Sequence, residues 1–309
     1  MMMKALLPIV IAIAIALAYA MRIAIVLAIA IALAACSGGS SPSEPSSATL
    51  ATTPKPDAGP AQLDLGKMVL VPAGSFPMGH AKADPGMYGA EWKENELPQH
   101  SVTLHAFYID RDEVTVGDYA RFLDAYGDPS AQDAHQPIRV ANGVHEPLPG
   151  AAKLPIAFVS WFDAQAFCAF AGKSLPTEAE WERAAKGPKD DRRYPWGDDG
   201  ATCTKAVFTS QARCEDALAS VGSRSPAGDS PEGCHDLAGN VAEWVLDWYA
   251  RYPGAGSASD PKGPDDGTLR VVRGGSAADP PAAIRSTSRF GADPSNRSEE
   301  VGFRCVHRL

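Results

Sequence analysis

Residues Arg270 to Val306 read RVVRGGSAADPPAAIRSTSRFGADPSNRSEEVGFRCV, and they say most about how this chain folds. Glycine and proline recur in them without helical periodicity, which is typical of turns that join short strands. The same character extends over residues 187–309. No cysteine lies between Cys234 and Cys305, and Pro280-Pro281 stiffens the segment after the RGGS turn. We therefore expect irregular β structure in the C-terminal part of the chain.

The residues before this part predict three helices. Val114 to Gly127 contain Thr115 as an N-cap, an apolar stripe on helical spacing, and Gly127 as a stop signal. Trp161 to Lys173 form the second helical pattern. The third helix begins at a capping box, in which Thr177 caps the first turn and Glu180 reaches back to the Thr177 amide.

Two further segments predict strands. Lys67 to Gly79 reads as a strand, a Pro-Ala-Gly turn and a second short strand, and His100 to Asp110 alternates well enough for a strand. Asp128 to Leu154 carries Pro, Gly, His and Asn without periodicity, so we expect a long loop there. Helices early in the chain and irregular β structure later indicate the α+β class.

Three motifs carry a family resemblance: AGKSLPTEAEWERAA at residues 171–185, GCHDLAGNVAEW at residues 233–244, and the RGGS-to-GFR segment quoted above. Together they resemble the formylglycine-generating enzyme family, also called sulfatase-modifying factors. The resemblance covers roughly Met68 to Val306 and implies one formylglycine-generating-enzyme-like domain over residues 67–309. It also implies a fold related to C-type lectin domains and low in regular secondary structure.

Active members of this family carry two cysteines shortly after the RGGS turn, and their thiolates hold the copper that converts a substrate cysteine to formylglycine. Asp279 and Ile284 stand near those places here. Soft Cu(I) needs thiolates, and neither a carboxylate nor an aliphatic side chain replaces them. We therefore expect no copper site, unless Cys203, Cys214 or Cys234 takes over that role.

The family places RGGS beside its substrate groove, and this implies a candidate pocket. Its residues here are Ser276, Asp279 and Arg289. Arg273, Arg289 and Arg304 match the arginines of RGGS, the downstream position and GFR. We interpret these arginines as structural residues that bind carbonyls and carboxylates in a domain with few regular ladders.

Six cysteines occur in a chain that we expect to be exported, so disulfides are allowed. The resemblance implies a disulfide between Cys168 and Cys305. Cys203 and Cys214 flank a short variable loop and are the favoured second pair, which leaves Cys234 free. A bridge from Cys234 to Cys203 or to Cys214 stays open at this stage.

The segment HDLAGNVAEW, residues 235–244, matches the calcium-binding segment of the family. Carried over by position, the ligands are the side chains of Asp236 and Glu243 and the backbone carbonyls of Gly239 and Val241. Carboxylate and carbonyl oxygens suit Ca²⁺, and glycine lets the backbone wrap around the ion. The alternative is a glycine-turned loop with a capped aspartate and a surface glutamate. We expect a structural calcium ion.

The N-terminal residues predict export and lipid attachment. Apolar runs cover residues 5–19 and 23–35, and the second follows Met21-Arg22 and ends in Leu33-Ala34-Ala35-Cys36. This order is typical of a signal peptide, residues 1–35, with Met21 as a candidate start. Leu-Ala-Ala-Cys resembles the lipobox of bacterial lipoproteins, in which Cys36 is lipidated. The alternative, a transmembrane helix or hairpin, is disfavoured because neither run reaches the ~20 apolar residues that span a bilayer.

Residues 36–66, rich in Ser, Pro and Ala, predict a disordered tether between the lipid and the domain. Ser37 follows the lipidated cysteine in place of an aspartate, which by resemblance to enterobacterial sorting favours the outer membrane. The net charge is −9 and no Lys/Arg run occurs, so nucleic acid is not expected as a partner. We expect a lipid-anchored protein of the bacterial cell envelope, with the membrane as one partner.

These features favour a binding or assembly module for a protein or peptide ligand, without copper–thiolate chemistry. The alternative is an oxidoreductase of the formylglycine-generating type, or a tailoring enzyme, with unusual site residues. The missing cysteine pair separates the two hypotheses, because function resides in the site and not in the fold.

Overall fold

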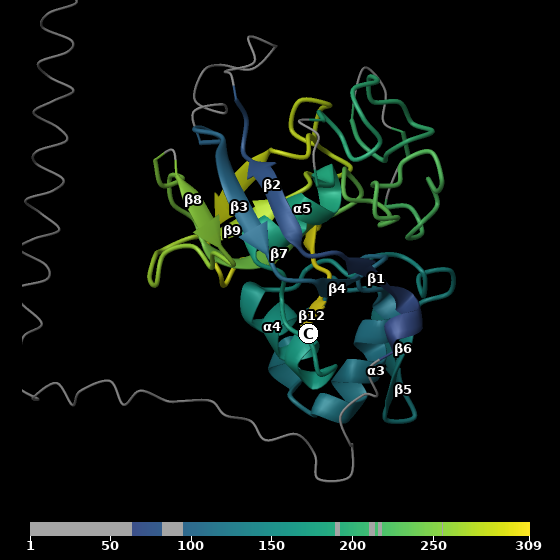
Figure 1. Ribbon diagram of the computed structural model, residues 1–309. Helices are drawn as coiled ribbons and strands as arrows, with labels where there is room; N and C mark the ends of the chain where they lie inside the picture. The colour runs from purple at the N-terminus through teal and green to yellow at the C-terminus, as the bar shows by residue number, and fades with distance from the viewer. Residues whose placement is uncertain (1–63, 82–94, 189–191, 210–213, 216–217, 255) are drawn as a thin grey trace, which may run out of the picture. The chain divides into compact units, whose positions relative to one another are not determined.

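The structure is a computed structural model, and it describes residues 64–309 apart from 82–94, 189–191, 210–213, 216–217 and 255 (Figure 1). The predicted signal peptide, Cys36 and the tether up to residue 63 lie outside the described residues. No helix in the described part of the chain is long and apolar enough to cross a membrane.

Short strands form four small sheets among these residues. The first has the order β1-β4-β12 and contains Met68–Val71, Phe107–Asp110 and Val306–Arg308. The second, β2-β3-β8, contains Gly74–Met78, His100–Leu104 and Ser257–Ser259. The largest, β10-β9-β7-β11, contains Arg289–Ala292, Arg270–Arg273, Ala242–Trp248 and Val301–Gly302. The fourth is the hairpin of β5 (Ile138–Ala141) and β6 (Val144–Pro147).

Two of the predicted helices begin and end at the predicted residues. α3 (Val116–Tyr126) begins after Thr115, whose side chain accepts a hydrogen bond from the backbone of the third residue along, and ends at Gly127. Gly127 has φ 72°, a left-handed conformation that glycine adopts at little cost. α5 (Glu178–Lys186) begins with the predicted capping box. These two predictions are confirmed.

The other helix, α4 (Trp161–Phe170), starts where predicted and stops three residues earlier. It has a capping box of its own, in which the Ser160 side chain accepts from the Asp163 amide and Asp163 accepts from the Ser160 amide. Two 3-10 turns, Leu65–Lys67 and Pro129–Ala131, complete the helical elements of the described residues.

Two predictions of secondary structure were wrong in detail. The strand expected over His100 to Asp110 is split into β3 and β4, which belong to different sheets. The chain turns at His105, whose amide and ring both bond to Asp260. The loop expected over Asp128 to Leu154 contains the β5–β6 hairpin. Its turn is Asn142-Gly143, both with positive φ, which is the strongest short hairpin signal.

The core consists of two large apolar clusters and a small third one. In the first, α3 and α4 pack together, with the rings of Phe122 and Phe167 5.4 Å apart. In the second, α5 packs against β2, β7 and β9 (Figure 1). Trp181 of α5 is fully buried in this cluster. The third cluster includes Ile284 and lies beside the RGGS turn. The α+β class and the irregular β structure after residue 187 are confirmed.

Candidate functional site

The loop after β9 carries the predicted pocket, and a tight backbone turn shapes it. Gly274 and Gly275 have φ of 86° and 64°, a region that favours glycine. A Cβ on Gly275 would lie 2.8 Å from the carbonyl of Ala283, so the two arms of the loop approach closely. Asp279 Oδ2 accepts hydrogen bonds from the Ser276 amide at 2.9 Å and the Ser276 hydroxyl at 3.0 Å. Ser276 and Asp279 therefore hold each other within the loop.

The two positions that match the copper ligands hold no thiol. Asp279 has its carboxylate on Ser276, and Ile284 is fully buried in the small apolar cluster with Tyr194 and Phe208. Cys234 is the free thiol of the described residues; it is buried, and burial raises its pKa to about 12. At neutral pH this group is a thiol and not a thiolate, which is the form that binds a soft metal. None of these side chains offers the ligand pair that copper needs.

The predicted pocket of Ser276, Asp279 and Arg289 does not form as one site. Ser276 lines a cleft of about 300 Å³, whose other walls include Phe158, Asn240, Ala277, Glu299 and Glu300. Arg289 lines a different cavity and binds Glu178 through two hydrogen bonds of 2.6 and 2.7 Å. Arg289 lies in the strand β10, thirteen residues beyond Ser276, and its register against β9 directs it to α5.

The interpretation of the arginines as structural residues is confirmed. Arg273 is fully buried and binds Glu178 at 2.9 Å and Glu182 at 2.7 Å. Burial acts to raise the pKa of Glu178, but Arg289 and Arg273 outweigh it, so this pKa lies below its usual value. Arg304 donates to the carbonyls of residues 110, 111 and 235 as well as to a carboxylate. The Arg304 guanidinium therefore satisfies backbone carbonyls that the ladders of longer strands would otherwise satisfy.

The predicted calcium segment is held by protein partners. Glu243 is fully buried, and its two oxygens accept from the Arg304 guanidinium at 2.7 to 2.9 Å and from Trp181 Nε1 at 2.8 Å. Asp236 Oδ2 accepts from the amide of Gly222 at 2.6 Å. As arranged, Glu243 does not fit a calcium ligand, because the ion would have to displace Arg304 from it.

Calcium binding at Asp236, Gly239, Val241 and Glu243 therefore stays a prediction. The described residues contain no group of three or more His, Cys, Asp or Glu side chains arranged to hold a metal ion. The alternative to calcium, a glycine-turned loop, had Glu243 as a surface glutamate. That part of the alternative is wrong, since Glu243 is fully buried.

Sequence reasoning missed Glu113, a buried acid that fixes the same segment. Its carboxylate accepts from Asn240 Nδ2 at 2.8 Å and from the Val241 amide at 3.2 Å. Burial raises the pKa of Glu113 well above its usual value, and Asp236 and Glu243 raise it further. Gly239-Asn240, where both residues have positive φ, is a local signal of a tight turn. No sequence pattern near this turn indicates that Asn240 binds Glu113, which is 127 residues away.

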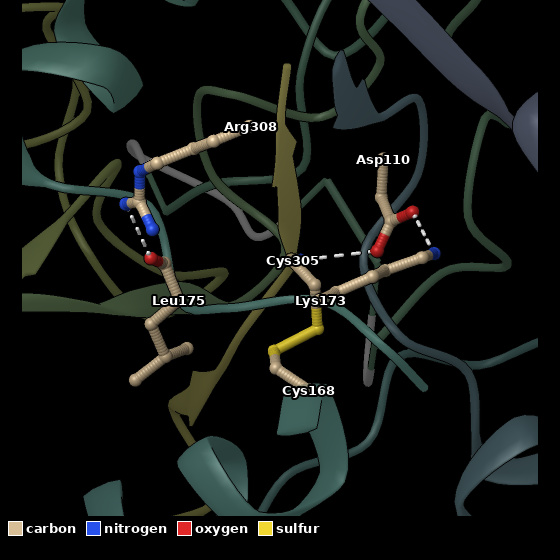
Figure 2. Close-up of a disulfide and its surroundings, with 6 residues drawn as sticks. All are labelled: Asp110, Cys168, Lys173, Leu175, Cys305 and Arg308. Atoms are coloured by element: carbon tan, nitrogen blue, oxygen red, sulfur yellow. Dashed lines mark hydrogen bonds and ion pairs between the residues drawn. A yellow bond between two sulfur atoms is a disulfide. The ribbon is translucent and has the colours of Figure 1, made fainter. Parts of the chain in front are cut away.

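The cysteine pairing is confirmed. Cys168 of α4 is bonded to Cys305, with a Cα–Cα distance of 5.7 Å (Figure 2). Cys203 is bonded to Cys214. Figure 2 also shows Asp110 beside the first bridge, where it accepts from the Cys305 amide at 3.0 Å and from Lys173 Nζ at 2.5 Å. The alternative pairings of Cys234 are excluded by this geometry.

The sulfatase-modifying factor enzyme 1-like domain matches residues 53–309, so the chain belongs to this family. Mouse formylglycine-generating enzyme is 30% identical over 299 residues, covering 83% of this chain and 79% of the enzyme. A cattle protein named inactive C-alpha-formylglycine-generating enzyme 2 is 31% identical, covering 77% and 87%. Serine/threonine-protein kinase pkn1 of Chlamydia pneumoniae is 33% identical over 79% of this chain, which spans only 38% of the kinase. The solved structure of Treponema denticola variable protein 1 has a TM-score of 0.60 at 25% identity, covering 78% and 95%.

Proposed function

We propose that the chain is a binding or assembly module of the bacterial cell envelope that keeps the family fold and does not perform copper–thiolate oxidation. The observation that carries this proposal is the loop after β9, where Asp279 is bound by Ser276 and Ile284 belongs to the apolar core. A soft copper ion needs thiolates at such positions. The family includes a cattle protein that is named as inactive.

The alternative is an oxidoreductase that uses other site residues. The 30% identity to mouse formylglycine-generating enzyme favours it. The same fold supports both hypotheses, so only the chemistry of the site separates them.

The cleft beside Ser276 is the surface that we assign to the ligand. Its volume of about 300 Å³ is sufficient for a few side chains of a bound protein or peptide. Phe158 and two prolines supply apolar walls, and three acids add negative charge: Glu215, Glu299 and Glu300. Charge complementarity therefore favours a peptide segment that combines apolar and basic side chains.

Fluorescence anisotropy with labelled hexapeptides tests this assignment. Peptides that combine Leu or Phe with Arg should bind, and Glu in place of Arg should weaken binding by about tenfold or more, because the cleft is acidic. Ala278 is exposed and lines the cleft, so Ala278→Trp should fill it without disturbing the core. Ala81→Trp is the matched control, since Ala81 is exposed and outside the cleft. Equal affinity of both variants would contradict the assignment.

We also propose that Cys36 is lipidated and anchors the domain at the outer membrane. The support is the sequence Leu33-Ala34-Ala35-Cys36, followed by the Ser/Pro/Ala-rich tether. Cys36→Ala should leave the membrane fraction, because each acyl methylene adds ~0.8 kcal/mol of membrane affinity. Ser37→Asp should keep the lipid and shift the protein towards the inner membrane. An alanine variant that is processed normally and still floats with membranes would contradict the anchor.

A further inference from the structure

The two disulfides of the described residues differ in their access to solvent. Cys203 is exposed and Cys214 is partly buried, whereas Cys168 and Cys305 are both fully buried. A thiolate must reach a sulfur atom to cleave a disulfide, so access controls which bridge reacts first. A buried bridge reacts only when the surrounding core opens, whereas an exposed one needs no more than a local opening. The Cys203–Cys214 bridge is therefore the one that an external thiol can cleave in the folded protein.

The exposed bridge closes a short loop, residues 203–214, part of which packs into the domain. Val207 and Phe208 of this loop are buried. Phe208 belongs to the small apolar cluster that contains Ile284, and Cys214 packs against the same cluster. The Cys214 amide also donates a hydrogen bond to the Phe208 carbonyl at 3.2 Å. The disulfide and these contacts together hold the loop on the apolar cluster.

Thr209 of this loop binds the segment that forms one wall of the proposed ligand cleft. Its amide donates to the Asp279 carbonyl at 2.8 Å, and its hydroxyl donates to the Ala277 carbonyl at 2.9 Å. Ala277 lines the cleft. Residues 276–279 belong to no helix or strand, so hydrogen bonds from other segments are needed to fix their backbone. Thr209 supplies two of these bonds.

Two further walls of the cleft are connected to the same loop. The Asn240 amide donates to the Val207 carbonyl at 2.8 Å, and the Asn240 carbonyl accepts from the Ala277 amide at 2.8 Å. Glu215 follows Cys214 directly in the chain. Asn240 and Glu215 both line the cleft. The disulfide-closed loop therefore positions the cleft walls at three places: Ala277, Asn240 and Glu215.

We propose that the Cys203–Cys214 bridge is a thiol–disulfide exchange site that controls the order of the cleft walls, an inference that rests on the cleft being the ligand site. A dithiol reductant attacks one sulfur of the bridge, the S–S bond breaks, and a mixed disulfide forms. The second thiol of the reductant then displaces the protein. Two electrons and two protons pass from the dithiol to the protein, which leaves two cysteine thiols, and the dithiol becomes a disulfide. An oxidised dithiol restores the bridge by the reverse reaction.

Cleavage of this bridge should loosen the cleft without unfolding the domain. The bridge restricts a loop whose ends are 11 residues apart, and reduction returns conformational freedom to that loop. Thr209 and Asn240 are then held by noncovalent contacts alone, so the population of molecules with ordered cleft walls decreases. The apparent affinity for a ligand falls with the population of the binding-competent state, and we expect a decrease of about tenfold. The Cys168–Cys305 bridge stays intact and preserves the fold.

Titration of the full chain with dithiothreitol identifies the bridge that reacts. Thiols are trapped with N-ethylmaleimide, and the labelled residues are mapped by mass spectrometry. Cys203 and Cys214 should be labelled at dithiothreitol concentrations at least about tenfold lower than Cys168 and Cys305, because only the first pair is accessible in the folded protein. Labelling of both pairs at the same concentration would overturn the proposal.

Hydrogen exchange of the selectively reduced protein shows whether the cleft walls loosen, and it needs no ligand. The amides of Thr209 and Asn240 should exchange at least about tenfold faster after reduction, because both donate to carbonyls across the contact between the loop and the cleft. The Asp110 amide is the internal control, since it donates to the Cys305 carbonyl beside the buried bridge. Unchanged exchange at Thr209 and Asn240 would refute the inference.

Fluorescence anisotropy with the Leu/Phe–Arg hexapeptides connects the reaction to binding. Affinity should fall about tenfold on selective reduction and recover on reoxidation. The variant Cys203→Ala/Cys214→Ala should bind as weakly as the reduced protein and should not respond to dithiothreitol. Cys234→Ala is the matched control, and it should keep the response because Cys234 is buried and lies outside the loop.

The outcomes separate this inference from the proposed function. Equal affinity of the oxidised and reduced forms contradicts the exchange site and leaves the ligand cleft standing. Binding of the peptides to neither form contradicts the ligand cleft, and hydrogen exchange at Thr209 and Asn240 then decides whether reduction orders or loosens these walls. If the double alanine variant does not fold, the selectively reduced parent protein gives the answer.

Discussion

Removing the Cys168–Cys305 disulfide should destabilise this domain more than any other loss of a covalent link in it. The bridge joins α4 to the residue just before β12, and the two cysteines are 137 residues apart in the sequence (Figure 2). A cross-link over n residues lowers the entropy of the unfolded chain by about 2.1 + 1.5R ln n cal/mol/K. For this loop the loss is about 17 cal/mol/K, or about 5 kcal/mol at 25 °C.

The second disulfide gives an internal standard. Cys203 and Cys214 are 11 residues apart, and the same relation gives about 2.8 kcal/mol. We therefore expect the variant Cys168→Ala/Cys305→Ala to lose about 2 kcal/mol more than Cys203→Ala/Cys214→Ala. Such a difference corresponds to roughly a thirtyfold change in the unfolding equilibrium.

Urea unfolding under non-reducing conditions, followed by tryptophan fluorescence, measures these losses. Cys234→Ala is the control, because Cys234 is buried and unbridged and its removal reports the cost of losing a buried sulfur alone. The Cys234→Ala cost is subtracted twice from the loss measured for Cys168→Ala/Cys305→Ala, because both of these cysteines are buried. If the corrected loss for the long bridge does not exceed that for the short one, the loop-entropy reasoning is refuted.

Three further predictions concern buried charge, pH and calcium. Arg304→Leu leaves the fully buried Glu243 carboxylate without its cation and should cost about 3 to 5 kcal/mol by urea unfolding; a loss below about 1 kcal/mol would contradict the structural role. The hydrogen bond to Asp112, opposed by burial, raises the pKa of His235, so its stabilising effect should be full below the ordinary pKa of 6.5 and decline as the pH rises through the raised value. Unfolding of His235→Gln and the parent over a pH series checks this, and a stability gap that widens with pH contradicts it. If calcium binds, a chelator should lower the melting temperature of the parent and not of Asp236→Ala, and an unaffected parent would show that no structural calcium is present.

The elements that could be predicted from sequence are those fixed by local chemistry. Thr115 and Thr177 each have a partner three residues along, so the starts of α3 and α5 were visible in the residues themselves. The hairpin at Asn142-Gly143 had an equally local signal, which was outweighed by the lack of alternation in the surrounding residues.

The ion pairs of the core could not be predicted in this way. Arg285 binds Glu96 with both ends of its guanidinium, at 2.6 and 2.7 Å, across 189 residues of sequence. Nothing near either residue specifies the other, because the pairing depends on how the sheets are placed in space. The same limit applies to Ser276 and Arg289. The family resemblance of the RGGS segment suggested one pocket for both, and the β9–β10 register places them in two different cavities.

The most direct test of the central claim is whether the protein converts a peptide that bears a sulfatase-type cysteine motif. The peptide is incubated aerobically with the purified protein, with and without Cu(I), and its mass is measured. We predict an unchanged mass, because Asp279 and the buried Ile284 replace the thiolates and Cys234 remains a protonated, buried thiol. A stoichiometric mass loss at the peptide cysteine, absent with heat-killed protein, would contradict the account and support the oxidase hypothesis.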